Sequence, residues 1–177
     1  MAVRFKQLTF AISILLLSWY GMMAVHELGH VIATYATGGT VIEVVLEPLS
    51  ISHTEYGELP HPGIVVWSGP LIGSILPLAL VPAGKMGQFF AGFCLVANGA
   101  YIGLGSVAGV GDCGLMLLTG SPMWVMWIFG LVAFPLGLYL WHRLGSLADY
   151  WRWRVSKRAG LAAPAMLVAA LTTMAVW

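Results

Sequence analysis

Long apolar runs separated by short polar segments set the organisation of this chain. The runs cover residues 9–36, 64–82, 87–109, 123–141 and 159–177. A helix needs about 20 apolar residues to cross the hydrocarbon core of a bilayer, and each run is close to or above that length. The pattern therefore predicts an all-α polytopic membrane protein with a bundle of about five transmembrane helices. We expect a single domain, 1–177, with a core over 9–120 and accessory spans in 121–177.

Residues 40–58, between the first two runs, have a different character. β-branched residues dominate 40–47, Pro48 interrupts them, and partial alternation resumes over 51–56. This pattern is typical of short strands. We expect a small membrane-associated β-hairpin or sheet at the membrane surface, with an ordinary connecting loop as the alternative.

The composition agrees with membrane insertion. Hydrophobic residues make up 59% of the chain and charged residues 8%, whereas soluble domains carry about 25% charged residues. The formal net charge of +1 gives no reason to expect nucleic acid as a partner. Two cysteines, Cys94 and Cys113, are too few for a disulfide framework. The expected surroundings are a lipid bilayer.

The charged residues are distributed unevenly along the chain. If the N-terminus is cytoplasmic and the chain spans five times, all eight lysines and arginines fall on one side, and the four glutamates of 40–58 fall on the other. Such a bias of Lys and Arg sets the orientation of membrane proteins. We therefore expect a multi-pass protein of the cell membrane whose N-terminus and segment 142–158 are cytoplasmic.

The first apolar run contains the motif H-E-x-x-H, formed by His26, Glu27 and His30. On a helix, two histidines at this spacing project from one face and can hold one Zn²⁺, with Glu27 beside the open position of the metal. The metal acidifies a bound water, and the glutamate accepts its proton. The alternative is a set of polar residues that only pack inside a bundle, but ionisable groups within a span are costly and usually functional.

A catalytic zinc ion needs three protein ligands. Asp112 is the acidic residue besides Glu27 that we expect at membrane depth, and glycines flank it where the third run breaks. We predict Asp112 as the third ligand. The alternative role for Asp112 is the N-cap of the short apolar piece that follows. The other candidate ligands are Cys113, His53, His61 and the glutamates of 40–58.

These features resemble the site-2 protease family of intramembrane zinc metalloproteases over about residues 20–120. The resemblance rests on the H-E-x-x-H motif inside a span, Ser68-Gly69-Pro70 opening the next span, and an aspartate in a broken third span. It implies a core of three helices, zinc held by His26, His30 and Asp112, and Glu27 as the general base. It also implies that an unwound substrate strand pairs with the β-rich segment.

The third-span motif departs from the family pattern, which usually places Asn and Pro shortly before Asp-Gly. Here the residues are Gly111-Asp112-Cys113-Gly114, and the nearest upstream asparagine is Asn98. Asn98 is our candidate for substrate binding, with an interhelical hydrogen bond as the alternative.

The expected function is that of a zinc metalloendopeptidase that hydrolyses a peptide bond in a membrane-embedded or membrane-proximal protein or peptide. Two other functions use the same sequence features. One is a membrane zinc hydrolase acting on a non-peptide substrate such as a lipid amide. The other is a non-catalytic membrane protein that binds a metal or a partner helix, although such a site has no need of Glu27.

Overall fold

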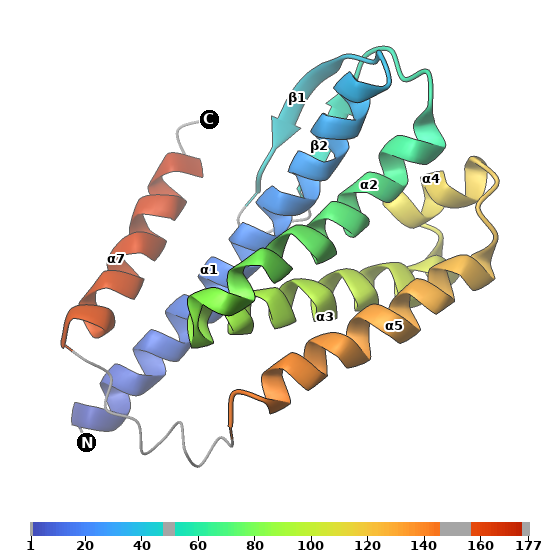
Figure 1. Ribbon diagram of the computed structural model, residues 1–177. Coiled ribbons are helices and arrows are strands. Elements are labelled where there is room, and N and C mark those ends of the chain that lie inside the picture. Colours follow the sequence, from blue (N-terminus) through green and yellow to red (C-terminus); the bar gives the residue numbers. More distant parts are fainter. Residues whose placement is uncertain (1, 48–51, 146–156, 175–177) are drawn as a thin grey trace.

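The computed structural model describes residues 2–47, 52–145 and 157–174. In this part of the chain the protein is mostly helical, with a two-stranded hairpin after the first helix (Figure 1). The elements in chain order are α1 (Ala2–Ala36), β1 (Val41–Val45), β2 (His53–Tyr56), α2 (Pro62–Ile75), the 3₁₀ helix η1 (Leu76–Ala83), α3 (Lys85–Ala108), α4 (Asp112–Leu118), α5 (Met123–His142) and α7 (Lys157–Met174).

Four helical segments of the described chain are long and apolar enough to cross a membrane: Phe5–Ala36, Pro62–Ala83, Lys85–Ala108 and Met123–His142. They confirm the first four predicted spans to within a few residues. The fifth predicted span, 159–177, is helical as α7, but its apolar part, Gly160–Thr172, is shorter than the other four, and its last three residues lie outside the described residues. The four long helices indicate a multi-pass membrane protein.

Prolines divide the second span into two kinds of helix. Pro70 lies inside α2, and Pro77 lies in the first turn of η1. A proline has no backbone N–H and cannot continue the α-helical hydrogen-bond ladder. The α-helix of the second span accordingly gives way to a 3₁₀ helix after Ile75.

Glycines allow α3 and α5 to pack closely along their lengths, as Figure 1 shows. A Cβ atom added at Gly130 would lie 2.8 Å from the Cα atom of Gly103, and one added at Gly99 would lie 2.6 Å from the backbone nitrogen of Phe134. Small residues at such crossings are the usual means by which membrane helices associate. Gly99 and Gly103 of α3 therefore serve the packing of α3 against α5.

The predicted hairpin is also present. β1 pairs with β2 in antiparallel register, with Val44 opposite Thr54 and Val45 opposite His53. Side chains alternate in burial at the start of β2, where Thr54 and the preceding Ser52 are buried while His53 is exposed. The buried side faces α1, because the Ser52 hydroxyl donates to the Met23 sulfur at 3.3 Å.

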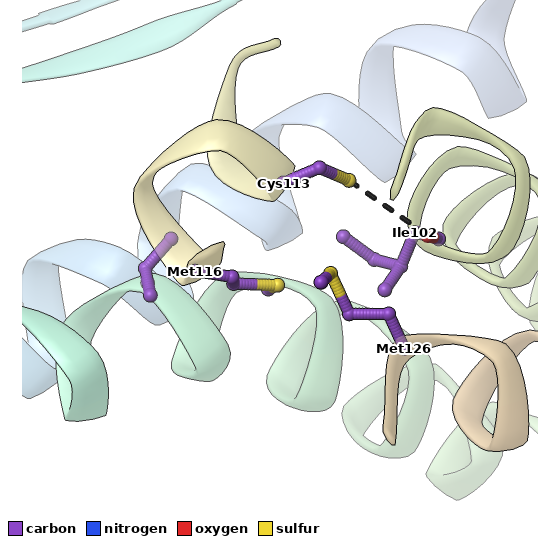
Figure 2. Packing of buried hydrophobic residues seen from close by; sticks show 5 residues of the cluster. Ile102, Cys113, Met116 and Met126 are labelled. Carbon is purple, nitrogen blue, oxygen red and sulfur yellow. Dashed lines mark hydrogen bonds between the residues drawn. The ribbon is translucent and has the colours of Figure 1, made fainter. Parts of the chain in front are cut away.

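The third span ends where the sequence predicted a break. Gly109 and Gly111 both have positive φ, +62° and +57°, and α4 starts directly after them. Buried side chains of α2, α3 and α5 pack against those of α4, and Figure 2 shows Met116 of α4 beside Met126 of α5 and Ile102 of α3. The core thus fixes a short helix whose first residue is Asp112.

Candidate metal centre

Three side chains that are distant in sequence converge at the junction of α1 and α4. The Nε2 atom of His26 lies 2.8 Å from Oδ2 of Asp112, and Nε2 of His30 lies 3.5 Å from the same oxygen. One ligand atom from each residue falls within 4.8 Å of the others. Both histidines are buried and Asp112 is partly buried. The three predicted ligands therefore form one group, as the i, i+4 spacing and the glycine break suggested.

The other ring nitrogen of each histidine is held by an acceptor. His26 Nδ1 lies 2.7 Å from Oδ1 of Asn98, whose amide nitrogen donates to the Cys94 carbonyl at 2.9 Å. His30 Nδ1 donates to the Val65 carbonyl at 2.8 Å. A carbonyl oxygen can only accept, so both Nδ1 atoms carry the hydrogen.

These contacts leave the Nε2 atom of each histidine directed at Oδ2 of Asp112, at 2.8 and 3.5 Å. Two ring nitrogens and a carboxylate oxygen at these distances are bridged either by a proton on Nε2 or by a metal ion bound between them. Metal-binding histidines characteristically donate their second N–H to a carbonyl or a carboxylate in this way. The chemistry of the donor set therefore fits a divalent metal ion.

Gly69 of α2 lies directly against the ligand nitrogens. A Cβ atom added at this position would fall on Nε2 of His30 and 2.8 Å from Nε2 of His26. The two helices cross closely here, since the Ser68 hydroxyl donates to the Gly29 carbonyl at 2.9 Å. The Gly69 backbone thus leaves open the space that an ion would need.

Glu27 lies beside the ligands on the same helix and is buried. Its Oε2 atom accepts a hydrogen bond of 2.7 Å from the Thr54 hydroxyl of β2. The hairpin therefore contacts the motif directly, through the carboxylate that we predicted to act as the base.

A cavity of about 380 Å³ opens onto the three ligands and Glu27. One wall is apolar and comes from α1 and α3; its residues are Trp19, Met22, Met23, Ala97 and Ala100. Residues 52–54 and Tyr56 line the cavity from the hairpin side. Burial raises the pKa of the Tyr56 phenol, and the charges of Asp112 and Glu27 raise it further, so Tyr56 is a neutral hydrogen-bonding group.

The alternative ligands lie elsewhere. The Cys113 sulfur faces the backbone carbonyl of Tyr101 at 3.6 Å and that of Ile102 at 3.8 Å, inside the hydrophobic core. Figure 2 shows the contact with Ile102. His61 is exposed at the start of α2, and the His53 side chain is 54% exposed beside Glu55. The glutamates of 40–58 are all exposed.

The N-cap interpretation of Asp112 is wrong, because Gly111 occupies the cap and Asp112 is the first residue of the helix.

Two residues that reach the centre, Thr54 and Tyr101, have no signal in the sequence, and the backbone N–H of Asp112 donates to the Tyr101 hydroxyl at 3.1 Å. Gly69 belongs to the Ser68-Gly69-Pro70 motif, but the motif did not predict its contact with the histidines. Asn98 was singled out for substrate binding; it lines the cavity but is only 1% exposed and contacts His26. Its predicted role with substrate stays a prediction.

Comparisons of the chain with protein-family models, curated protein sequences and solved structures return no match.

Proposed function

We propose that this protein is an intramembrane zinc metalloprotease resembling the site-2 proteases. The observation that carries the proposal is the convergence of two Nδ1-protonated histidines and a carboxylate, with Glu27 lining the same cavity. A structural metal site has no use for an additional buried carboxylate, whereas a hydrolytic site needs a base. The four long apolar helices support a substrate within or beside the membrane.

Zinc is the ion that best suits these donors. Imidazole nitrogen and carboxylate oxygen are zinc ligands, and a set of two histidines and one carboxylate is found in catalytic rather than structural zinc sites. Bound Zn²⁺ supplies Lewis acidity, which lowers the pKa of water and polarises a carbonyl group.

Glu27 performs the proton transfers in this proposal. Its carboxylate accepts one proton from the attacking water as the new C–O bond forms. It then gives that proton to the departing amine nitrogen as the C–N bond breaks. Each turnover consumes one water and leaves one carboxyl group and one amine. The Thr54 hydroxyl orients Glu27 by donating to Oε2, which leaves Oε1 for the water.

The hairpin is suited to hold the substrate in an extended form. A helical peptide hides its carbonyl groups in hydrogen bonds, so the segment to be cleaved must unwind. An exposed strand edge can pair with such a segment, and residues 52–54 of the hairpin line the cavity at the metal centre.

The test is a comparison of wild type with Glu27→Gln. Both proteins are purified in detergent, loaded with zinc and incubated with a library of apolar peptides, and new termini are identified by mass spectrometry. The expected result is peptide cleavage by wild type alone, with equal zinc content in the two proteins. Release of fatty acid from lipid amides without any peptide cleavage would instead identify a lipid hydrolase. A zinc-loaded wild type without turnover on either substrate would identify a binding protein.

A further inference from the structure

Hydrolysis of an amide places negative charge on the carbonyl oxygen, and hydrogen-bond donors aimed at that charge contribute strongly to catalysis. Asn98 is the side-chain amide in the cavity, but the structure engages both ends of it. Its oxygen accepts from His26, and its nitrogen donates to the Cys94 carbonyl. These contacts hold Asn98 against the proposed metal ligand His26. A donor to the carbonyl oxygen of the substrate must therefore come from another polar group that lines the cavity.

Tyr101 of α3 presents a hydroxyl at the same centre. Its ring meets the His26 ring edge-on with centroids 6.0 Å apart. Its oxygen accepts a hydrogen bond of 3.1 Å from the backbone N–H of Asp112, so the hydroxyl lies beside the residue that carries the proposed ligand carboxylate. The loop is pressed against it, since a Cβ atom at Gly111 would lie 2.5 Å from the hydroxyl oxygen.

The direction of the Tyr101 O–H follows from these contacts. The N–H of Asp112 already points at the oxygen, so the hydroxyl hydrogen must turn away from that side. No described residue accepts this hydrogen, although Tyr101 lines the cavity that contains the three ligands. The position of the hydroxyl is thus fixed by α3 and by the backbone N–H of Asp112, and its hydrogen is available for donation to a group in the cavity.

We infer that Tyr101 donates a hydrogen bond to the carbonyl oxygen of the substrate as that oxygen becomes negatively charged. This inference rests on the proposed function. In this arrangement Glu27, which the hairpin holds through Thr54, transfers the protons. Tyr101, which belongs to α3, stabilises the charge on the carbonyl oxygen. Because the bond strengthens as charge develops, Tyr101 acts on kcat more than on substrate binding.

The test is Tyr101→Phe, which keeps the ring contacts and removes the hydroxyl. With a peptide that wild type cleaves, kcat should fall about 10²-fold to 10³-fold, as for the loss of one oxyanion donor, while KM is unchanged. A second readout needs no turnover. A phosphonate analogue of the same peptide carries a tetrahedral anion, and its affinity for the zinc-loaded protein should fall by a factor of at least ~10.

The matched control is Tyr139→Phe. Tyr139 lies on α5, is 54% exposed and does not line the cavity. We expect this variant to keep the kcat and the phosphonate affinity of wild type. Tyr56 is the other tyrosine of the cavity and lies beside His30, with ring centroids 6.4 Å apart. A loss in Tyr56→Phe with none in Tyr101→Phe would place the donor on β2 and overturn the assignment.

Zinc content separates the inferred role from a structural one. If Tyr101 only positions Asp112, Tyr101→Phe will bind zinc more weakly, and excess zinc will restore both kcat and phosphonate affinity; that result overturns the inference. Full activity of Tyr101→Phe at normal zinc content overturns it too, while leaving the protease function intact. A wild type that holds zinc but cleaves no peptide removes the proposed function and this inference together.

Discussion

At the scale of single residues, the candidate metal centre depends on a glycine as much as on its three proposed ligands. Gly69 has no Cβ, and its backbone lies where a side chain would cover the Nε2 atoms of His26 and His30. The neighbouring backbone cannot retreat easily, because a Cβ at Gly29 would already lie 2.9 Å from the Gly69 Cα. The requirement is steric rather than conformational, since Gly69 has ordinary helical geometry.

We therefore expect Gly69→Ala to abolish metal binding while the bundle still folds. The zinc content of the purified variant should fall to near zero. Gly63→Ala is the matched control on the same helix, because its Cβ would make only ordinary contact with Thr119 at 3.7 Å. Equal zinc in the two variants would show that the ion does not lie beside Gly69.

Thr54 is the residue through which the hairpin reaches Glu27. Thr54→Val keeps the shape of the side chain but leaves the buried Oε2 of Glu27 without its donor. A hydrogen bond to a charged group contributes about 1.5–3 kcal/mol, so kcat should fall about 10-fold to 100-fold at unchanged zinc content. Thr54→Ser restores the hydroxyl and should recover most of the rate. Failure of serine to rescue would assign the loss to packing of the hairpin.

The residues of the centre differ in how far the sequence could predict them. His26, Glu27 and His30 follow from helical spacing alone, and Asp112 follows from its place in a glycine-rich break. Thr54, Tyr101 and Gly69 do not follow, because each acts through a contact between elements far apart in the chain. Asn98 was recognised as a polar residue within a span, but its contact with His26 became visible only once α1 and α3 were placed together.

At the scale of elements, α4 is the part whose position matters most. It has only seven residues and is held by Cys113 and Met116, which are both fully buried. Its first residue, Asp112, faces the histidines, so any loosening of α4 displaces the carboxylate that we propose as a metal ligand. The hydrophobic core thereby holds the candidate metal centre together.

Met116→Ala tests this dependence. Truncation of a buried methionine leaves a cavity and costs about 2–5 kcal/mol of stability. We expect a lower unfolding temperature in detergent together with weaker zinc binding. Leu118→Ala is the control on the same helix, because Leu118 is 86% exposed. Zinc affinity that is unchanged in Met116→Ala would show that Asp112 is held without the core.

The elements themselves were largely predictable. Apolar runs bounded by glycine or by polar residues located the long helices, and β-branched residues located the hairpin. The 3₁₀ form of residues 76–83 was not predicted, because prolines indicate a break in the α-helix but not what replaces it. The extent of α4 was not predicted either, since seven residues are too few to show a helical period.

At the scale of the whole molecule, the hairpin and the turn at Gly84 lie at opposite ends of the second span. The uneven distribution of Lys and Arg predicts that the hairpin faces away from the cytoplasm. The segment around Ser156, which we also expect to be cytoplasmic, lies outside the described residues. The orientation therefore stays a prediction, to be tested at positions 58 and 85.

Cysteine labelling tests the orientation. Cys94 and Cys113 are both fully buried, so the unmodified chain should give little background. In intact cells, a membrane-impermeant maleimide should label Glu58→Cys, whereas Lys85→Cys should react only after the cells are opened. Labelling of Lys85→Cys alone in intact cells would show that the orientation is the reverse of the predicted one. Labelling of both variants would contradict the prediction that the second span crosses the membrane.

The central claim is that His26, His30 and Asp112 together hold a zinc ion, and the metal content of the purified chain tests it most directly. Wild type, Glu27→Gln and Cys113→Ser should each contain about one zinc ion per chain. His26→Ala and Asp112→Asn should contain almost none, because asparagine is a neutral and poorer ligand that keeps the size of the side chain. Zinc in Asp112→Asn at the wild-type level, or none in wild type purified without chelator, would contradict the account.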